Sequence, residues 1–585
     1  MLLIVTRFVC SVFFVNMNNL NAVDFLMKFR IYTLFIFFVL GVSGGAFAGG
    51  TATCAVVYDY GWDNTTTHWL TNPVRAYCAV EDIGKICDIH VSQNINCTKS
   101  DEGGVPWYQA AIDYAANKNG SGALVEPGRR QYPVVALTRG VVNVKYPIEA
   151  DWPLGKIGIH LQGGVQLIGV PAQFGTTLVK LDKSWNRNDL LNHMIVSSAS
   201  RVGDVLNPGR KINSVVIDSI AISGSLEDAI PGCKVFDDRH SHVKNGVFVF
   251  NAEADQFGLS LNVTNLILQQ LKGNAIELGF YSPFVDSGKA SCTNDMLCKQ
   301  GLILDVSGKG GSDPAYVAYN NICGVGYGGI TIIGKNVKVE GNSILHVAKT
   351  WDGENKSVGS TMGISIGFVG SSSNYVINNV IEGGDYGVGS DGSFPVFIMP
   401  EYYKKYWSAI TEVHPEFSIK YPNGPVDSSG KAYLKPMDDI LANQVLMDVA
   451  SKRAAQVDDR VGFVIYPVIQ GNRITNSTVG VSLFKVDGAK ISNNVINSTS
   501  KSKFGILFDS AVNSFAYDNR INWWPVGVYV TGMPYQVSKW GSSYNGIGIK
   551  PPLEGSNQWA YPGNIFQGNI RNVVIEKAGS GNNIH

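Results

Sequence analysis

Residues 480–496 read GVSLFKVDGAKISNNVI, and this stretch contains both halves of a module that recurs along the chain. The first half is a glycine followed by alternating aliphatic residues, and the second half is an Asn-x-Ile triplet. Other copies begin at residues 329, 363 and 505 and place their asparagines at Asn342, Asn379 and Asn519. A module that recurs in this way predicts a fold built from one structural unit that repeats along the chain.

The length of the repeat decides which unit this is. Asn320 and Asn342 are 22 residues apart, as are Asn472 and Asn494. Such a unit is too short for a βαβ crossover, contains two runs of period two, and cannot bury its apolar side alone. Coils stacked about 4.8 Å apart would place the Ile side chain of each coil above that of the coil below. An Asn at a fixed corner tolerates the left-handed backbone of the bend, and its side-chain amide can bond the Asn amide of the next coil. We therefore predict an all-β right-handed parallel β-helix, because a β-sandwich needs paired hairpin turns and would not keep Asn in register.

Breaks in the repeat predict loops that leave the β-helix. The largest is a long insertion at 393–460, within which residues 437–456 have the pattern of a helix. Shorter excursions are expected at 231–245, 281–314 and 349–361. With these loops included, residues 106–585 form the predicted β-helix domain, which follows a Cys-rich region at 49–105.

Residues 1–48 have the features of an export signal. A basic start at 27–30 precedes a short apolar run at 31–40 and the small-x-small site Ala46-Phe47-Ala48. The apolar run is shorter than the about 20 residues that cross a bilayer. We therefore expect a secreted or periplasmic protein whose mature chain begins near Gly49 and has no membrane span; a membrane anchor that includes residues 13–15 is the alternative.

The cysteines are consistent with export. Of nine in the sequence, Cys10 precedes the expected cleavage site, and the even number that is left predicts disulfides. Cys292 and Cys298 are close enough in sequence to close a small loop. The other disulfide pairs cannot be read from the spacings, and none of the spacings is a convincing zinc pattern. A group of four lies near the start of the mature chain, at Cys54, Cys78, Cys87 and Cys97.

Charge and composition exclude some functions. Lys+Arg and Asp+Glu are both 47, so the formal net charge is zero, whereas phosphate binding needs a surplus of clustered cations. We therefore expect no nucleic-acid partner. The 65 glycines and the charged fraction of only 16% favour short strands and tight turns over helical bundles.

The start of the β-helix domain resembles the pectate-lyase superfamily. WYQAAID at 107–113 resembles the helix that caps the first coil in that superfamily, and LVEPG at 124–128 resembles the strand and Pro-Gly turn that follow. VQLIG at 165–169 is similar to the next strand. The resemblance implies a right-handed parallel β-helix with an N-terminal capping helix, and polysaccharide as the partner.

One strand resembles polygalacturonases more closely. MGISIG at 362–367 resembles their Gly-His-Gly-x-Ser-x-Gly strand, but Met362 stands in the place of the histidine. Gly387-Val388-Gly389 stands where those enzymes have Arg-Ile-Lys, and no pair of aspartates precedes the strand by one coil. The resemblance therefore does not carry the polygalacturonase catalytic residues onto this chain.

Stacked coils can bring carboxylates together. Equivalent outward positions lie about 5 Å apart on adjacent coils and roughly 9.5 Å apart two coils away. Retaining and inverting glycosidases use separations of about 5–5.5 Å and 6.5–9.5 Å. Glu277 is the main catalytic candidate because Ile276 and Leu278 should point inward, and Asp305 is outward by the same alternation and is a candidate for substrate contact. The alternative is that both are solvated surface acids.

The densest charged cluster is DDRHSH at 237–242. Asp237 and Asp238 could take a proton or a calcium ion, Arg239 could neutralise a uronate, and His242 could act as a base. These four residues join Glu277 as catalytic candidates. His240 and His242 would face the same way on an extended chain, but without a third ligand we expect no metal site. A solvated charged loop is the alternative reading.

Further candidates for substrate contact come from loops. Asp385 and Asp391 flank Gly387 at a coil edge, where aspartates also serve as turn residues. Aromatic side chains of the insertion could stack on sugar rings or pack the insertion against the β-helix. The candidates for substrate contact are Asp385, Tyr402, Tyr406 and Trp407.

Together these patterns predict a secreted carbohydrate-active protein that cleaves a polysaccharide as a glycoside hydrolase or a polysaccharide lyase. The alternative is a non-catalytic glycan-binding adhesin or tailspike-like surface protein. The long insertion favours the enzyme because lids close over substrate, and the missing family motif favours the binder. No cofactor is expected, apart from calcium if the reaction is an elimination, and the sequence leaves the sugar and the oligomeric state open.

Overall fold

The computed structural model describes residues between 53 and 575, with its larger gaps at 80–96, 121–132, 283–301, 349–360, 392–414, 420–463, 532–545 and 548–563. The expected export signal, almost all of the long insertion, Cys87, Cys292 and Cys298 lie outside the described residues. Within the described part of the chain, no helix is long and apolar enough to cross a bilayer.

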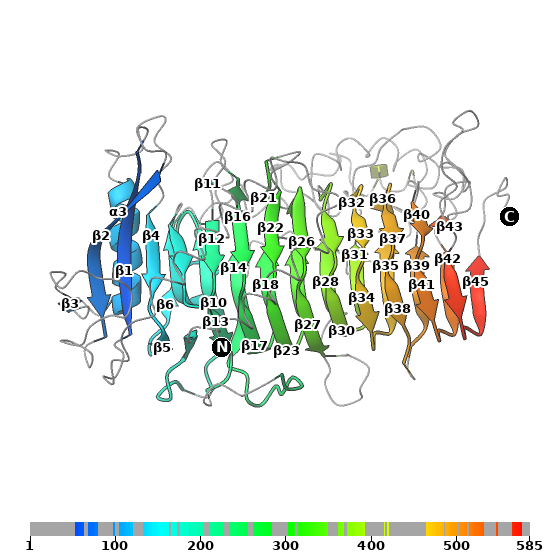
Figure 1. Cartoon of the computed structure of the whole chain (residues 1–585), viewed down its shortest axis with the longest axis horizontal. Coiled ribbons are helices and arrows are strands. Elements are labelled where there is room, and N and C mark those ends of the chain that lie inside the picture. The colour runs from blue at the N-terminus through cyan, green and yellow to red at the C-terminus, as the bar shows by residue number, and fades with distance from the viewer. Residues whose placement is uncertain are drawn as a thin grey trace, which may run out of the picture. The chain divides into compact units, whose positions relative to one another are not determined.

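Three long sheets carry the fold, and we name them A, B and C in the order in which each coil enters them. The strands of successive coils lie side by side in each sheet (Figure 1). Sheet A runs in the order β3 (Cys97–Lys99), β2 (His68–Cys78), β1 (Cys54–Asp63), β4 (Val134–Leu137), β8 (Gln166–Ile168), β12 (Val215–Asp218), β16 (Leu261–Thr264), β22 (Ala315–Ala318), β26 (Val337–Glu340), β29 (Tyr375–Ile377), β33 (Val468–Gln470), β37 (Lys490–Ser492), β40 (Phe515–Tyr517) and β43 (Gly546–Ile547).

Sheet B follows sheet A within each coil. Its order is β5 (Gly140–Val144), β9 (Thr177–Leu181), β13 (Ala221–Ser223), β17 (Ile267–Leu271), β23 (Asn321–Val325), β27 (Ser343–Val347), β30 (Val380–Gly383), β34 (Arg473–Thr475), β38 (Val495–Asn497), β41 (Arg520–Asn522) and β44 (Ile565–Gln567).

Sheet C completes the coil. Its order is β6 (Ile148–Glu149), β7 (Lys156–Gln162), β10 (Leu191–Ser198), β14 (Val243–Val249), β18 (Asn274–Leu278), β24 (Gly328–Ile332), β28 (Met362–Gly367), β31 (Tyr386–Asp391), β35 (Val479–Phe484), β39 (Phe504–Asp509), β42 (Val526–Thr531) and β45 (Arg571–Ile575).

Short strands fill some corners. They are β11 (Ile212–Asn213), β15 (Ala252–Glu253), β21 (Val306–Ser307) and β25 (Gly334–Lys335) in one small sheet, β32 (Val464–Ile465) with β36 (Val486–Asp487), and β19 (Phe280–Ser282) with β20 (Leu302–Leu304). Coil-to-coil pairing is parallel throughout the three long sheets from β7 onward, as in β18 with β24. The predicted parallel β-helix is therefore confirmed, and β1–β3 of the Cys-rich region continue its sheet A.

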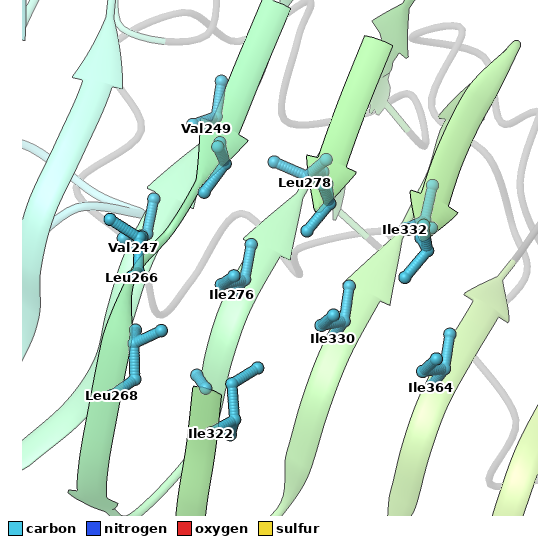
Figure 2. Packing of buried hydrophobic residues seen from close by; sticks show 14 of the residues in the cluster. Val247, Val249, Leu266, Leu268, Ile276, Leu278, Ile322, Ile330, Ile332 and Ile364 are labelled. Carbon is cyan, nitrogen blue, oxygen red and sulfur yellow. The ribbon is translucent and has the colours of Figure 1, made fainter. Parts of the chain in front are cut away.

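Aliphatic side chains of successive coils stack inside the β-helix. Val247, Ile276, Ile330 and Ile364 are register partners from β14 to β28, and each is fully buried (Figure 2). The glycine that opens each module leaves room for this stack, because a Cβ on Gly363 would collide with the Ile381 side chain. The module therefore begins with Gly for steric reasons and continues with Ile for burial.

Buried asparagines form the predicted ladder between sheets A and B. Asn494 Nδ2 donates to Asn519 Oδ1 (2.9 Å) and to the Ile469 carbonyl (2.9 Å). Asn494 Oδ1 accepts from the Asn472 backbone N–H (2.8 Å) and from Asn472 Nδ2 (3.0 Å). Every polar atom of this fully buried amide is thus satisfied. The same pattern repeats along the coils at Asn320, Asn342, Asn379, Asn472, Asn494, Asn519 and Asn564.

The sequence interpretation gave the ladder asparagines a left-handed backbone, and this detail is wrong. The left-handed residue is the one that precedes the ladder position, as in Asn378 (φ 57°), Asn493 (φ 57°) and Asp518 (φ 57°). The preceding residue makes the bend, because the ladder residue must point its amide into the corner.

Helix α3 (Trp107–Gly120) lies beside β1 and β2 (Figure 1). Its Tyr108 and Ile112 belong to the main apolar core. Gln109 Nε2 donates to the His160 carbonyl (3.0 Å) and Gln109 Oε1 accepts from the His160 N–H (2.9 Å). The helix therefore satisfies backbone groups of β7 that no neighbouring coil reaches.

Two disulfides lie in the described chain. Cys54–Cys78 joins β1 to β2, within the group of cysteines near the start of the mature chain. Cys233–Cys323 joins residue 233 to β23 across 90 residues, and the sequence analysis singled out neither of these two cysteines.

Asn494→Leu should lower the free energy of unfolding by about 1–3 kcal/mol, because Asn472 and Asn519 each lose their buried amide partner. Chemical denaturation followed by circular dichroism measures the change. Asn493→Gly is the matched control, since glycine accepts a left-handed backbone, and it should change stability by less than about 0.5 kcal/mol. An Asn494→Leu protein as stable as the control would contradict the ladder.

Candidate functional site

Glu277 lies on the outer face of sheet C, as its flanking residues predicted. Ile276 and Leu278 are fully buried in the core, and Glu277 between them is partly exposed. Its register partners are Phe248 on β14 and Thr331 on β24. Glu277 therefore belongs to a row of outward side chains that crosses successive coils.

Two amides hold one oxygen of the Glu277 carboxyl. Asn245 Nδ2 donates to Glu277 Oε2 at 2.7 Å, and Asn274 Nδ2 donates to the same oxygen at 3.2 Å. The amides are themselves fixed, because Asn245 Oδ1 accepts from the Asn274 backbone N–H (2.9 Å) and Asn274 Oδ1 accepts from Thr331 Oγ1 (3.2 Å). Within the described chain, Glu277 Oε1 receives no such bond.

His193 on β10 extends this network by one coil. Asn245 Nδ2 lies 3.3 Å from His193 Nδ1, and because an amide nitrogen only donates, this ring nitrogen is the acceptor. The ring stacks on Phe248 at a centroid distance of 4.6 Å and also bonds the Pro153 backbone. Burial lowers the pKa of His193 to about 3, assisted by the charge of Lys244. His193 therefore stays neutral above that pH and orients Asn245.

Burial raises the pKa of the Glu277 carboxyl above its usual value. Hydrogen bonds from Asn274 and Asn245 and the charge of Lys244 act in the opposite direction without cancelling the effect of burial. Phe248, its register partner, belongs to an apolar cluster on the outer face of sheet C. The site is thus a carboxyl group beside an apolar wall, with the exposed cation Lys244 nearby.

The carboxylates of the charged cluster at 237–242 are paired with nearby cations. Asp237 pairs with Arg239 (3.1 Å) and His240 (3.3 Å), and Asp238 pairs with Lys272 (3.2 Å). The hydrogen bond from Arg239 keeps the pKa of Asp237 below its usual value. Within the described chain, neither Asp237 nor Asp238 forms a hydrogen bond or ion pair with Glu277.

Residues 233–240 lie against sheet B, and we call them the strap. Gln270 on β17 anchors the strap, since its side chain accepts from the Asp237 N–H (3.0 Å) and donates to the Val235 carbonyl (3.0 Å). The Cys233–Cys323 disulfide is the second anchor. His242 follows the strap, where its backbone N–H donates to the Gly224 carbonyl (2.8 Å) just before β14.

The remaining candidates are dispersed. Asp305 lies between β20 and β21, and its carboxylate is 3.6 Å from Lys335 Nζ. Asp385 is buried and accepts from Thr361 Oγ1 (3.2 Å) and from the Thr361 N–H (3.1 Å), so its carboxylate bonds the neighbouring coil and not the backbone of its own turn. Outside the described residues lie Tyr402, Tyr406 and Trp407.

Metal ligands do not cluster in the described chain, where no three His, Cys, Asp or Glu side chains gather as a metal site. Sequence reasoning also missed four residues around Glu277: His193, Lys244, Asn245 and Asn274. Asn274 could have been found, because it is three residues before Glu277 on the same predicted strand. His193 and Asn245 are separated from Glu277 by 84 and 32 residues, and only coil register brings them together.

No protein-family model matches the sequence, and no curated protein matches it. Among solved structures, the A-module of the Azotobacter vinelandii mannuronan C-5 epimerase AlgE4 is 11% identical, with a TM-score of 0.36 over 81% of this chain and 94% of that one. A tailspike protein mutant of E. coli bacteriophage HK620 is 11% identical, with a TM-score of 0.41 over 85% of this chain and 66% of that one.

A mutant of the periplasmic alginate epimerase AlgG is 9% identical, with a TM-score of 0.27 over 76% of this chain and 82% of that one. At such identities the likeness concerns the fold alone. The chain is a parallel β-helix protein on the strength of its own strand pairing, which is the fold that the resemblance to the pectate-lyase superfamily implied.

Glu277→Gln should stabilise the protein at neutral pH. The folded state binds the Glu277 proton more tightly than the unfolded chain, so wild-type stability falls as pH rises above the ordinary carboxyl value of about 4.3. Gln does not titrate and keeps an oxygen for Asn245 and Asn274. The stability difference between variant and wild type should therefore grow between pH 4 and 8, as measured by urea unfolding.

Glu340→Gln is the control, because it removes an ion pair with Lys338 (2.7 Å) and should bring no gain at neutral pH. A Glu277→Gln difference that is constant from pH 4 to 8 would show that burial does not favour the protonated carboxyl.

Proposed function

We propose that this chain acts on polysaccharide at the outer face of sheet C, where Glu277 donates a proton to the oxygen of the bond that breaks. The observation that supports the proposal is a carboxyl group whose pKa is raised by burial and whose position is fixed by amides from two coils. Enzymes raise carboxyl pKa values in this way to keep a general acid protonated near neutral pH.

The hydrogen bonds indicate which oxygen carries the proton. Oε2 accepts from both Asn245 and Asn274, so its lone pairs are occupied. The acidic hydrogen of the neutral carboxyl therefore belongs on Oε1, which receives no bond in the described chain. In the proposed step, Oε1–H protonates the leaving oxygen while the bond from that oxygen to the sugar carbon breaks.

Hydrolysis and elimination differ in what else they need. Hydrolysis requires a second carboxylate about 5–9.5 Å from the acid. The register partners of Glu277 one and two strands away carry no carboxyl group; they are Phe248, Thr331, Val196 and Ser365. Elimination requires a cation near the substrate's carboxylate and a base that removes the adjacent proton. Lys244 is exposed and close enough to influence the pKa of both Glu277 and His193, so it supports the cationic role. Calcium is the cofactor to test for this route, by adding and chelating it.

A second candidate function is glycan binding without cleavage. The observation that favours binding is that the site holds a single carboxyl group among the described residues. Glu277 would then form hydrogen bonds to sugar hydroxyls. His193, Asn245 and Asn274 would position it for binding just as they would for catalysis.

We further propose that the protein works outside the cytoplasm. The two disulfides of the described chain, Cys54–Cys78 and Cys233–Cys323, support this, since such bonds persist in oxidising compartments. The expected export signal at residues 1–48 is consistent with the same location.

Glu277→Gln should lower cleavage of a polysaccharide substrate by about 100-fold or more, because general acid catalysis typically contributes 10²–10⁴-fold. A panel of acidic and neutral polysaccharides identifies the substrate, with reducing ends and unsaturated-product absorbance measured in parallel. Only elimination gives the absorbance, since it alone creates a new double bond.

Glu340→Gln is the matched control and should keep wild-type turnover. A substrate that Glu277→Gln cleaves at the wild-type rate would contradict the assignment of Glu277. If no polysaccharide in the panel is cleaved but one is bound, and Glu277→Gln weakens that binding, the binding function replaces catalysis.

A further inference from the structure

Adjacent tryptophans at the end of β41 have opposite environments. Trp524 is fully buried, and its Nε1 donates to the Ile496 carbonyl (3.1 Å). Trp523 is 60% exposed on a left-handed backbone (φ 68°), and its ring lies over Gly568 of the next coil, where a Cβ would collide with the indole. Trp524 therefore serves the core, whereas Trp523 presents an indole ring to solvent.

A row of polar side chains lies beside Trp523 on the outer face of sheet B. Asn497, Asn522 and Gln567 are register partners on β38, β41 and β44. Asn522 Nδ2 donates to Asn497 Oδ1 (3.0 Å), and within the described chain this is the bond that joins the two side chains. Asn497 Nδ2 and Asn522 Oδ1 thus remain as a donor and an acceptor at the surface, which is what sugar hydroxyls require.

Two exposed arginines border this row. Arg473 on β34 and Arg520 on β41 are in one register column with Val495 between them, so two strand spacings, roughly 9.5 Å, separate their backbones. In the described chain neither guanidinium has an ion-pair partner, and the neighbouring acid Glu382 lies 3.8 Å from His346 instead. Within the residues that the structure describes, the two cations are therefore not neutralised.

We propose that Trp523, the amide row and these two arginines form a binding surface for a polysaccharide that carries carboxylate groups. The indole offers an apolar platform for a sugar ring, the amides match hydroxyls, and each guanidinium can bind a carboxylate in bidentate fashion. Nucleic acid is the weaker fit, because two arginines on a chain of zero net charge give little neutralisation of phosphate. This surface lies on sheet B and does not depend on the proposed role of Glu277 on sheet C.

The test is binding of the full chain to immobilised polygalacturonate, alginate and hyaluronate, with dextran as the neutral polymer and a single-stranded oligonucleotide as the competing anion. At least one acidic polysaccharide should bind at least tenfold more tightly than dextran or the oligonucleotide. Trp523→Ala should weaken that binding about tenfold or more. Arg473→Gln with Arg520→Gln should abolish the preference over dextran and reduce the salt dependence.

The matched controls remove similar side chains that lie outside the proposed binding surface. Tyr466 is 52% exposed on a left-handed backbone and its ring lies over Gly488, so Tyr466→Ala mimics the loss at Trp523 on another corner. Lys490→Gln removes an exposed cation from sheet A. Both controls should bind within twofold of wild type, with melting temperatures measured for every variant.

Three results would overturn the proposal. They are equal binding of acidic polysaccharides and dextran by wild type, tighter binding of the oligonucleotide than of any polysaccharide, and equal losses in Trp523→Ala and Tyr466→Ala.

Discussion

The fold depends on one interaction, the amide-to-amide hydrogen bond between asparagines of neighbouring coils. Each buried Asn donates to the next Asn and to a backbone carbonyl, and it accepts two N–H bonds in return. A buried amide that lost this register would leave several polar groups without partners, each at a cost of about 1–3 kcal/mol. The ladder therefore fixes how each coil lies on the next, and with it which outward side chains become neighbours.

The outer face of sheet C uses the same chemistry for another purpose. His193, Asn245, Asn274 and Thr331 come from four successive strands, and the hydrogen bonds among them run from coil to coil as they do in the ladder. Here the row lies next to a carboxyl group beside an apolar cluster, and two of its amides donate hydrogen bonds to Glu277. Strands of the repeat thus position a titratable group through the hydrogen bonds that the described residues form.

The sequence predicted the fold well because its signals are periodic. The Gly and Asn-x-Ile modules gave the parallel β-helix and the ladder, and the Ile276–Leu278 alternation gave the outward position of Glu277. The partners of Glu277 could not be predicted, because His193 and Asn245 are distant in sequence and lie outside the module. The charge of the cluster at 237–242 suggested a catalytic site, yet its carboxylates form ion pairs with Arg239, His240 and Lys272.

The central claim is that coil register couples Asn245 and Glu277 through a hydrogen bond between neighbouring strands. A double-mutant cycle tests it most directly, with unfolding free energies of wild type, Asn245→Ala, Glu277→Ala and the double variant measured at one pH. The account predicts a coupling energy of about 1 kcal/mol or more, as for residues that share a hydrogen-bond network. Effects that add to within about 0.3–0.5 kcal/mol, as for independent sites, would contradict it.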